Sequence, residues 1–160
     1  LGGVYKLAAK KENGVFIPTL KISSSYEKTT NPGIKQVYRF FDKNGQALAD
    51  LITLDSEKVN LGENHIFYHP FSTQDMFVMR KNAYQDAVPL LKKQMENGKR
   101  IAPSPTLKAI QESSREKLSH FDKSYKRQVN PHIYKVSLST ELKNLKGNLI
   151  LQAKMAEDKI

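Results

Sequence analysis

The chain has 160 residues, enough for one ordinary domain that buries roughly 68–70% of the surface exposed by the unfolded chain. Its 39% hydrophobic and 26% charged residues are typical of a globular protein rather than a disordered one, and 26 Lys and Arg against 16 Asp and Glu give a net charge of +10. The absence of cysteine excludes disulfides, thiolate catalysis and Cys-based zinc sites, and it is compatible with a reducing cytosol. No apolar run is long enough to span a membrane.

The N-terminal hairpin is predicted from Asn13-Gly14, which lies between apolar-rich runs. A two-residue type I′ turn there would place Leu7 opposite Leu20 and Tyr5 opposite Ile22. The same register places Lys6 opposite Lys21, and two like charges facing each other destabilise a ladder unless an anion lies beside them. We therefore treat Lys6 and Lys21 as a candidate anion site, an interpretation that a register shift of one residue would remove.

A second hairpin is predicted around Asn44-Gly45, and here the charges compensate. The expected pairs are Arg39 with Asp50, Tyr38 with Leu51 and Val37 with Ile52. Between the two hairpins, the segment 29–33 (Thr-Thr-Asn-Pro-Gly) reads as a turn, because proline presets φ and glycine supplies a positive φ.

Residues 66–80 suggest further strand, broken at Pro70. From Asp86 onward, the chain is expected to be mainly helical. A helix is predicted from Asp86 to Asn97-Gly98, because Val88, Leu91 and Met95 recur at helical spacing.

A second helix is expected to begin with Ser104 as N-cap and Pro105 at its first position, and to end near Asn130. A short strand from His132 to Val136 follows. Ser139 then caps a final helix, which buries Leu142, Leu145, Leu149 and Ala153. The predicted fold class is α+β, with antiparallel β-hairpins followed by C-terminal helices.

Catalytic or metal-binding patterns are not evident in the sequence. The four histidines (His65, His69, His120 and His132) lack the spacing of a metal site, and no phosphate-binding loop or nucleophile elbow is present. Asp50 and Asp55 are better explained by a salt bridge and a turn than by acid–base chemistry. We therefore assign no catalytic and no metal-binding residue, and expect no cofactor bound by this segment alone.

The remaining candidates for a phosphate or pyrophosphate site are Gly2, Gly3, Lys6, Lys21 and Lys28. Paired glycines allow the backbone to approach a phosphate closely. Each residue also has an ordinary alternative, because the glycines could form a tight turn and the lysines could be exposed surface charges.

Several separated motifs occur in an order and spacing that resemble one enzyme family. They are residues 1–7 (Leu-Gly-Gly-Val-Tyr-Lys-Leu), 18–22, 27–33, 35–39, 42–45 with 49–52, 97–99, 103–107 and 130–132. Together they resemble the C-terminal region of the nicotinate phosphoribosyltransferases over essentially the whole chain. In that family, the strand resembling residues 1–7 follows the last phosphate-binding loop.

The resemblance implies an activity in NAD biosynthesis by the salvage route. Nicotinate and phosphoribosyl pyrophosphate would form nicotinate mononucleotide and pyrophosphate, driven by ATP hydrolysis, with Mg²⁺ and a phosphorylated histidine. We expect a cytoplasmic homodimer of the type II phosphoribosyltransferase fold, an incomplete α/β barrel plus a second domain. Residues 1–33 would adjoin the barrel and phosphate site, and 34–160 would form the C-terminal domain.

The resemblance also bears on the residues of the site. It implies that the chain starts inside a longer protein, with the catalytic histidine before Leu1, so the segment alone should be inactive. The related nicotinamide phosphoribosyltransferases hold phosphate groups with lysines after their phosphate loop. These positions resemble Lys6 and Lys21, and a third falls one residue from Lys28.

Two other functions remain open. The first is a basic nucleic-acid-binding module, because residues 92–127 hold ten basic and four acidic side chains. Against it, Phe121 and Tyr125 are expected on the apolar stripe and not among the charged faces, so we regard a nucleic-acid partner as the weaker alternative. The second is a purely structural interaction domain with no residue near a substrate.

Overall fold

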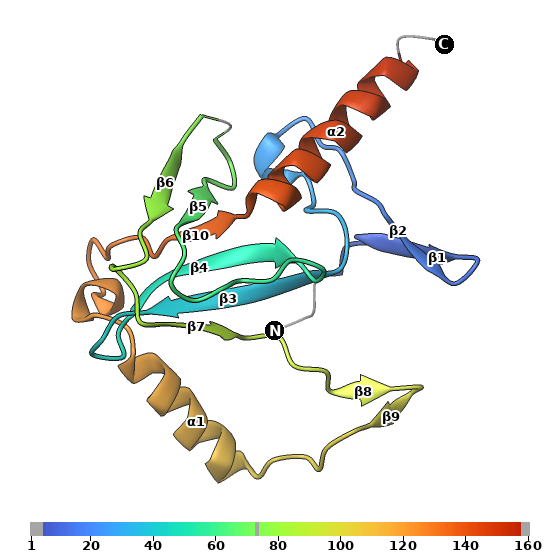
Figure 1. The fold of residues 1–160 in the computed structure, drawn as a ribbon. Coiled ribbons are helices and arrows are strands. Elements are labelled where there is room, and N and C mark those ends of the chain that lie inside the picture. Colours follow the sequence, from blue (N-terminus) through green and yellow to red (C-terminus); the bar gives the residue numbers. More distant parts are fainter. Residues whose placement is uncertain (1–4, 73, 158–160) are drawn as a thin grey trace.

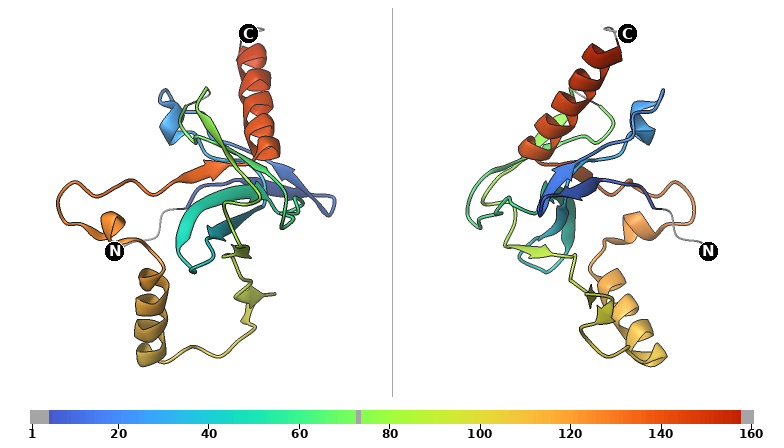
Figure 2. Two further views of the ribbon diagram at one scale, coloured as in Figure 1. Left: turned by 60° about the vertical axis from the view of Figure 1, so that its left-hand side comes forward. Right: turned by 90° about the vertical axis from the view of Figure 1, so that its right-hand side faces the viewer.

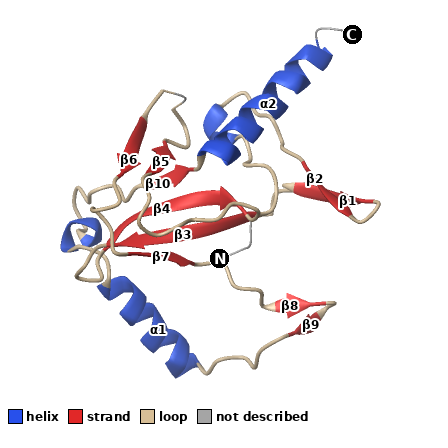
Figure 3. Ribbon diagram, viewed as in Figure 1, coloured by secondary structure: helices blue, strands red, loops and turns tan. Residues whose placement is uncertain are grey.

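A six-stranded mixed sheet forms the centre of the chain in the computed structural model, which describes residues 5–72 and 74–157 (Figures 1 and 3). The strand order is β6-β5-β10-β4-β3-β7. The bounds are β3 (Lys35–Phe41), β4 (Ala47–Leu54), β5 (His65–Tyr68), β6 (Met76–Met79), β7 (Asp86–Pro89) and β10 (Val136–Leu138). Two further two-stranded sheets, β1 (Ala9–Glu12) with β2 (Val15–Pro18) and β8 (Met95–Glu96) with β9 (Lys99–Arg100), lie outside it.

The hairpin of β3 and β4 contributes most of the core. From Lys35 to Phe40 its antiparallel register is the predicted one, with Arg39 opposite Asp50 and Tyr38 opposite Leu51, and a shift of one residue follows between Phe40 and Phe41. Gly45 supplies the positive φ of +75° in the turn. The innermost side chains are fully or almost fully buried, and they are those of Phe40, Ala49, Leu51 and Phe67. The sheet is therefore stabilised by hydrophobic burial and by edge-to-face aromatic contacts such as that of Phe40 with Phe67.

Strand β10 lies in the middle of the sheet although it comes late in the sequence. It pairs parallel with β4 and antiparallel with β5. The predicted strand 132–136 therefore exists, but it is shifted toward the C-terminus and overlaps the prediction only at Val136. The α+β class is confirmed, and the sheet is mixed rather than built from hairpins alone.

The helix predicted from Asp86 to Asn97 is wrong. Residues 86–89 form β7 at the edge of the sheet, antiparallel to β3, and the backbone N–H of Leu90 continues this pairing by donating to the Val37 carbonyl. Pro89 lacks an N–H and is accommodated at this outer strand. Asn97 and Gly98, with φ of 48° and 75°, form the turn of the β8–β9 hairpin and not a helix end.

The two α-helices extend from opposite sides of the sheet (Figure 2). Helix α1 (Leu107–Ser119) begins after Thr106, whose hydroxyl accepts from the Ala109 N–H, so Ser104 is not the N-cap. It also ends earlier than predicted, and a 3₁₀ turn, η2 (Lys123–Lys126), follows. Helix α2 (Thr140–Glu157) is capped by Ser139 as predicted, through a bond from the Leu142 N–H.

The inner face of α2 consists of the buried Leu142 and the half-buried Leu145, Leu149 and Ala153. No helix among residues 5–72 and 74–157 is both long and apolar enough to cross a membrane.

Candidate functional site

The register predicted for the first hairpin is correct, but the ladder is shorter than expected. Ala9 pairs with Pro18, and the Thr19 N–H donates to the Ala8 carbonyl. Lys6 and Lys21 lie beyond this ladder and are not cross-strand partners, so that pairing is wrong. The physical reason is a competing partner, because the backbone of Lys21 bonds to Thr30 instead, through its N–H to the Thr30 hydroxyl (2.8 Å) and its carbonyl to the Thr30 N–H (3.3 Å).

The structure still brings the Lys6 side chain and the backbones of Lys21 and Lys28 onto adjoining segments. The Lys6 ammonium donates to the Lys28 carbonyl at 3.4 Å, and Lys28 ends the 3₁₀ turn η1 (Tyr26–Lys28). Thr30, which binds Lys21, is only two residues further along the chain. Gly2 and Gly3 were also predicted to contribute, but they lie outside the residues that the structure describes.

The three lysine side chains are exposed, and within the described part of the chain none of them forms an ion pair. Their positive charge is therefore not neutralised by a neighbouring carboxylate. Exposed ammonium groups on adjoining segments can bind an oxyanion such as a phosphate or diphosphate.

The turn of residues 29–33 anchors these segments to the fold. Gly33 has the predicted positive φ, +83°, and its N–H donates to the Ala8 carbonyl at 2.7 Å. Thr29, Thr30 and Pro32 are buried. The turn thus joins the N-terminal hairpin, the segment of Lys21 and the start of β3.

Lys35 and Lys146 support this turn from inside the fold, and the sequence did not identify either of them. The Lys35 ammonium donates to the carbonyls of Asn31 (2.8 Å) and Gly33. The Lys146 ammonium, on α2, donates to the Asn31 Oδ1 at 3.0 Å and to the Thr29 carbonyl at 3.5 Å. Burial lowers the pKa of both lysines below the ordinary value of 10.5. One signal was available for Lys146, which is four residues after Leu142 and therefore on the buried face of α2.

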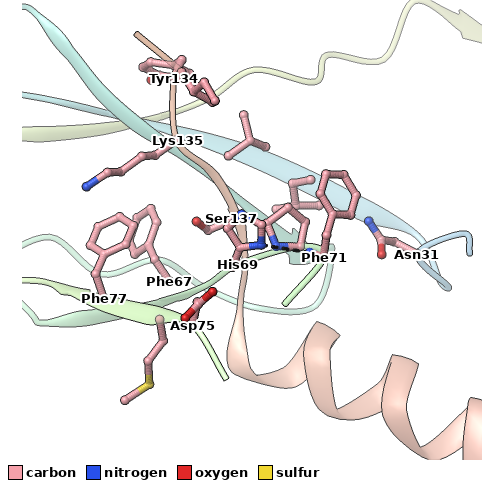
Figure 4. A pocket seen from close by; sticks show the side chains of 14 residues that line it. Asn31, Phe67, His69, Phe71, Asp75, Phe77, Tyr134, Lys135 and Ser137 are labelled. Carbon is pink, nitrogen blue, oxygen red and sulfur yellow. Dashed lines mark hydrogen bonds between the residues drawn. The ribbon is translucent and has the colours of Figure 1, made fainter. Parts of the chain in front are cut away.

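A cavity of about 560 Å³ lies between the loop after β5, strand β6 and the segment that leads into β10, and Asn31 of the turn also lines it (Figure 4). Its walls are mainly apolar, and it also meets polar groups, with the Lys135 ammonium 4.6 Å from the centre of the Phe77 ring. The His69 Nδ1 faces the backbone and accepts from the N–H groups of Phe71 and Ser72. Such a lining suits a small ligand or an apolar protein segment. The sequence did not predict it, because its walls come from segments far apart in the chain.

The remaining polar residues of interest have structural roles. Arg39 forms the predicted salt bridge with Asp50, with both bonds 2.8 Å long, and the Tyr134 hydroxyl donates to the same carboxylate at 2.9 Å. Burial and the Asp50 charge together raise the pKa of Tyr134 strongly. Asp55 follows β4 in a turn, as expected. Among the described residues, no group of three or more His, Asp and Glu could hold a metal ion.

Two aromatic rings of the basic segment 92–127 pack inward. The centre of the Phe121 ring lies 4.6 Å from the Arg39 guanidinium carbon, and the centres of the Tyr125 and Tyr134 rings are 5.4 Å apart. They are therefore not arranged as a platform on which nucleic-acid bases could stack.

Comparison with known proteins identifies relatives over most of the chain. A family model described as the nicotinate phosphoribosyltransferase C-terminal domain matches residues 34–146. The nicotinate phosphoribosyltransferase of Caenorhabditis elegans is 35% identical over 154 residues, which cover 95% of this chain and 26% of the relative. That of Bacillus subtilis (strain 168) is 36% identical over 142 residues, covering 88% of this chain and 28% of the relative.

The crystal structure of human nicotinic acid phosphoribosyltransferase has a similar fold, with a TM-score of 0.66 and 26% sequence identity. The match covers 76% of this chain and 24% of the human chain. The chain thus spans about a quarter of the length of these relatives. On the sheet, its hairpins and the match over residues 34–146, this chain belongs to the nicotinate phosphoribosyltransferase family and corresponds to its C-terminal domain.

Proposed function

We propose that this chain is the C-terminal part of a nicotinate phosphoribosyltransferase. The enzyme would form nicotinate mononucleotide and pyrophosphate from nicotinate and phosphoribosyl pyrophosphate, in the salvage route of NAD biosynthesis. Membership of the family supports this proposal. Coupling to ATP hydrolysis with Mg²⁺, a phosphorylated histidine outside this chain, a homodimeric assembly and a cytoplasmic location belong to the same proposal.

Within that enzyme, residues 1–33 would adjoin the barrel domain and the phosphate site, and residues 34–160 would form the C-terminal domain. The chain's own contribution would be basic groups, because Lys6, Lys21 and Lys28 are exposed and form no ion pair among the described residues. We assign no step through Mg²⁺ or ATP to this chain.

The observation that supports the site is that the Lys6 ammonium bonds to the Lys28 carbonyl, while the backbone of Lys21 bonds to Thr30, two residues after Lys28. In the proposed reaction, negative charge accumulates on the diphosphate leaving group as its bond to the ribose carbon breaks. Ammonium groups already held near that diphosphate would stabilise this charge in the transition state. The same groups would also bind the substrate before reaction, so both KM and kcat are expected to depend on them.

Substitution of the lysines in the full-length protein tests this role. Lys6→Ala and Lys21→Ala are each expected to raise the KM for phosphoribosyl pyrophosphate or lower kcat, reducing kcat/KM by about tenfold, which is typical for one lost charge-assisted contact. The KM for nicotinate should change little. Steady-state kinetics with each substrate varied in turn provide the measurement.

Lys10→Ala is the matched control, because Lys10 is an exposed lysine in β1 that forms an ion pair with Glu12. It should leave kcat/KM unchanged. All variants should keep the thermal stability of the parent protein, since the three lysines are exposed. Unchanged kinetics for both Lys6→Ala and Lys21→Ala would contradict the site and favour a purely structural role for this chain.

A further inference from the structure

Lys146 is a buried cation that has no carboxylate partner among the described residues. Its side chain is only 2% exposed, and it extends from helix α2 to the segment that contains Tyr26–Lys28. The ammonium is held by oxygen atoms of Thr29 and Asn31 and lies 4.3 Å from the centre of the Tyr26 ring. All its recorded partners therefore belong to one short stretch of chain, residues 26–31.

That stretch is the same one to which the candidate phosphate-binding lysines are attached. Thr29 and Asn31 flank Thr30, which bonds to both the N–H and the carbonyl of Lys21. The Lys28 carbonyl accepts a hydrogen bond from the Lys6 ammonium. A continuous series of contacts thus leads from α2 through the turn to the exposed lysines. A shift of Thr29 and Asn31 would move the attachment points of Lys6 and Lys21.

Burying an ammonium group beside a turn has a large unfavourable desolvation free energy. Removing the charge from water is unfavourable unless strong partners compensate, and neutral oxygen atoms and a ring face compensate less than a carboxylate does. An apolar side chain of similar length would avoid this penalty, although it would leave the Asn31 Oδ1 and the Thr29 carbonyl without this donor. The distinctive property of the lysine is a directed bond to both oxygens, which fixes the orientation of the turn.

We propose that Lys146 is a positioning residue, which sets the geometry of the Thr29–Asn31 turn and thereby places Lys6 and Lys21 for binding a diphosphate group. The proposal rests on the proposed function. Lys146 would affect substrate binding indirectly, because it is buried and acts through the turn. The candidate site would thus include a helix that follows the turn by more than a hundred residues.

The test is a set of variants in the full-length protein. Lys146→Met is expected to raise the KM for phosphoribosyl pyrophosphate about fivefold to tenfold, comparable to loss of one hydrogen-bonded contact, while the KM for nicotinate stays constant. Lys146→Arg, which keeps the charge and donors, should recover part of this loss. Lys154→Met is the matched control, since Lys154 is an exposed lysine on the same helix. Thr30→Val, which removes the hydroxyl acceptor of Lys21 and preserves the side-chain shape, tests the same series of contacts if Lys146→Met folds poorly.

Combination with the exposed lysines separates positioning from simple support of the fold. In a Lys6→Ala, Lys21→Ala background, Lys146→Met should cause no further rise in KM, because the groups that it positions are absent. An equal additional rise in that background, or an unchanged KM for both Lys146→Met and Thr30→Val, would overturn the inference. If Lys6→Ala and Lys21→Ala themselves leave the kinetics unchanged, the proposed phosphate site fails first, so the two failures are distinguishable.

Discussion

At the scale of single residues, the ion pair of Arg39 and Asp50 has the most partners among those in the described part of the chain. The two side chains are 18% and 9% exposed, and the carboxylate also receives the Tyr134 hydroxyl. The guanidinium lies against the Phe121 ring as well. The pair therefore joins two neighbouring strands to the segments on either side of η2, and its main role is to hold that part of the chain against the sheet.

Breaking this pair should be strongly destabilising. Arg39→Met leaves the Asp50 carboxylate buried with only the Tyr134 hydroxyl, and we expect a loss of about 3–5 kcal/mol in the free energy of unfolding. Denaturant unfolding of the purified protein measures it. The exposed pair of Lys108 and Glu112 is the control, because Lys108→Ala should change stability by about 0.5 kcal/mol or less. Similar effects of the two substitutions would show that the Arg39 pair is not a stabilising contact.

The sequence predicted this pair and missed Lys146 for a physical reason. Arg39 and Asp50 are opposite each other in a hairpin of neighbouring strands whose short turn at Asn44-Gly45 is recognisable in the sequence, so local rules suffice. Lys146 and its acceptors are separated by 115 and 117 positions, and no local pattern relates a lysine on a late helix to carbonyl groups near the N-terminus. The pairing of Lys6 with Lys21 failed for a similar reason, because Thr30 competes for the Lys21 backbone.

At the scale of elements, the turn before β3 depends on Gly33. Both Gly33 and Gly45 have positive φ values, +83° and +75°. They differ in surroundings, because a Cβ at Gly33 would lie 3.0 Å from Leu54 Cδ2, whereas a Cβ at Gly45 would meet nothing within 4 Å. The two glycines therefore separate backbone strain from crowding.

Gly33→Ala should destabilise the protein by about 2–3 kcal/mol, because it adds crowding to a left-handed backbone strain of about 1–2 kcal/mol. Gly45→Ala should show the strain alone. The difference between the two midpoints of thermal unfolding measures the crowding. Equal shifts would mean that Leu54 moves aside at no cost and that the packing around the turn is loose.

The elements were predictable where the local signal and the tertiary environment agree. The hairpin at Asn44-Gly45 and the cap of α2 at Ser139 were both predicted and observed. The structure of segment 86–97 was not predicted correctly. Val88, Leu91 and Met95 happen to be spaced as in a helix, but the edge of β3 was available for pairing, and β7 pairs with it. The start of α1 was misplaced because Ser104 and Thr106 are both competent caps, and only the observed bond to Ala109 distinguishes them.

At the scale of the whole molecule, the net charge of +10 does not by itself define a partner. The basic segment 92–127 contains one Phe and one Tyr, and both rings pack inward, so neither offers a surface on which nucleic-acid bases could stack.

We therefore expect no saturable binding of a labelled single-stranded RNA at about 150 mM salt, and only weak binding at low salt. Fluorescence anisotropy titrations at two salt concentrations measure this. Submicromolar binding that persists at the higher salt and is lost when Lys99 and Arg100 are replaced by alanine would support the nucleic-acid alternative instead.

The position of β10 determines when this sheet can be completed. Residues 136–138 separate β4 from β5, so before they are synthesised the two halves of the sheet have no shared strand and expose unpaired backbone edges. On the ribosome, the N-terminal hairpins can form early, but the central closure must wait for nearly the entire segment to emerge. Chains truncated before Val136 should consequently aggregate, and folding of the full chain should be slow because its decisive pairing connects distant positions.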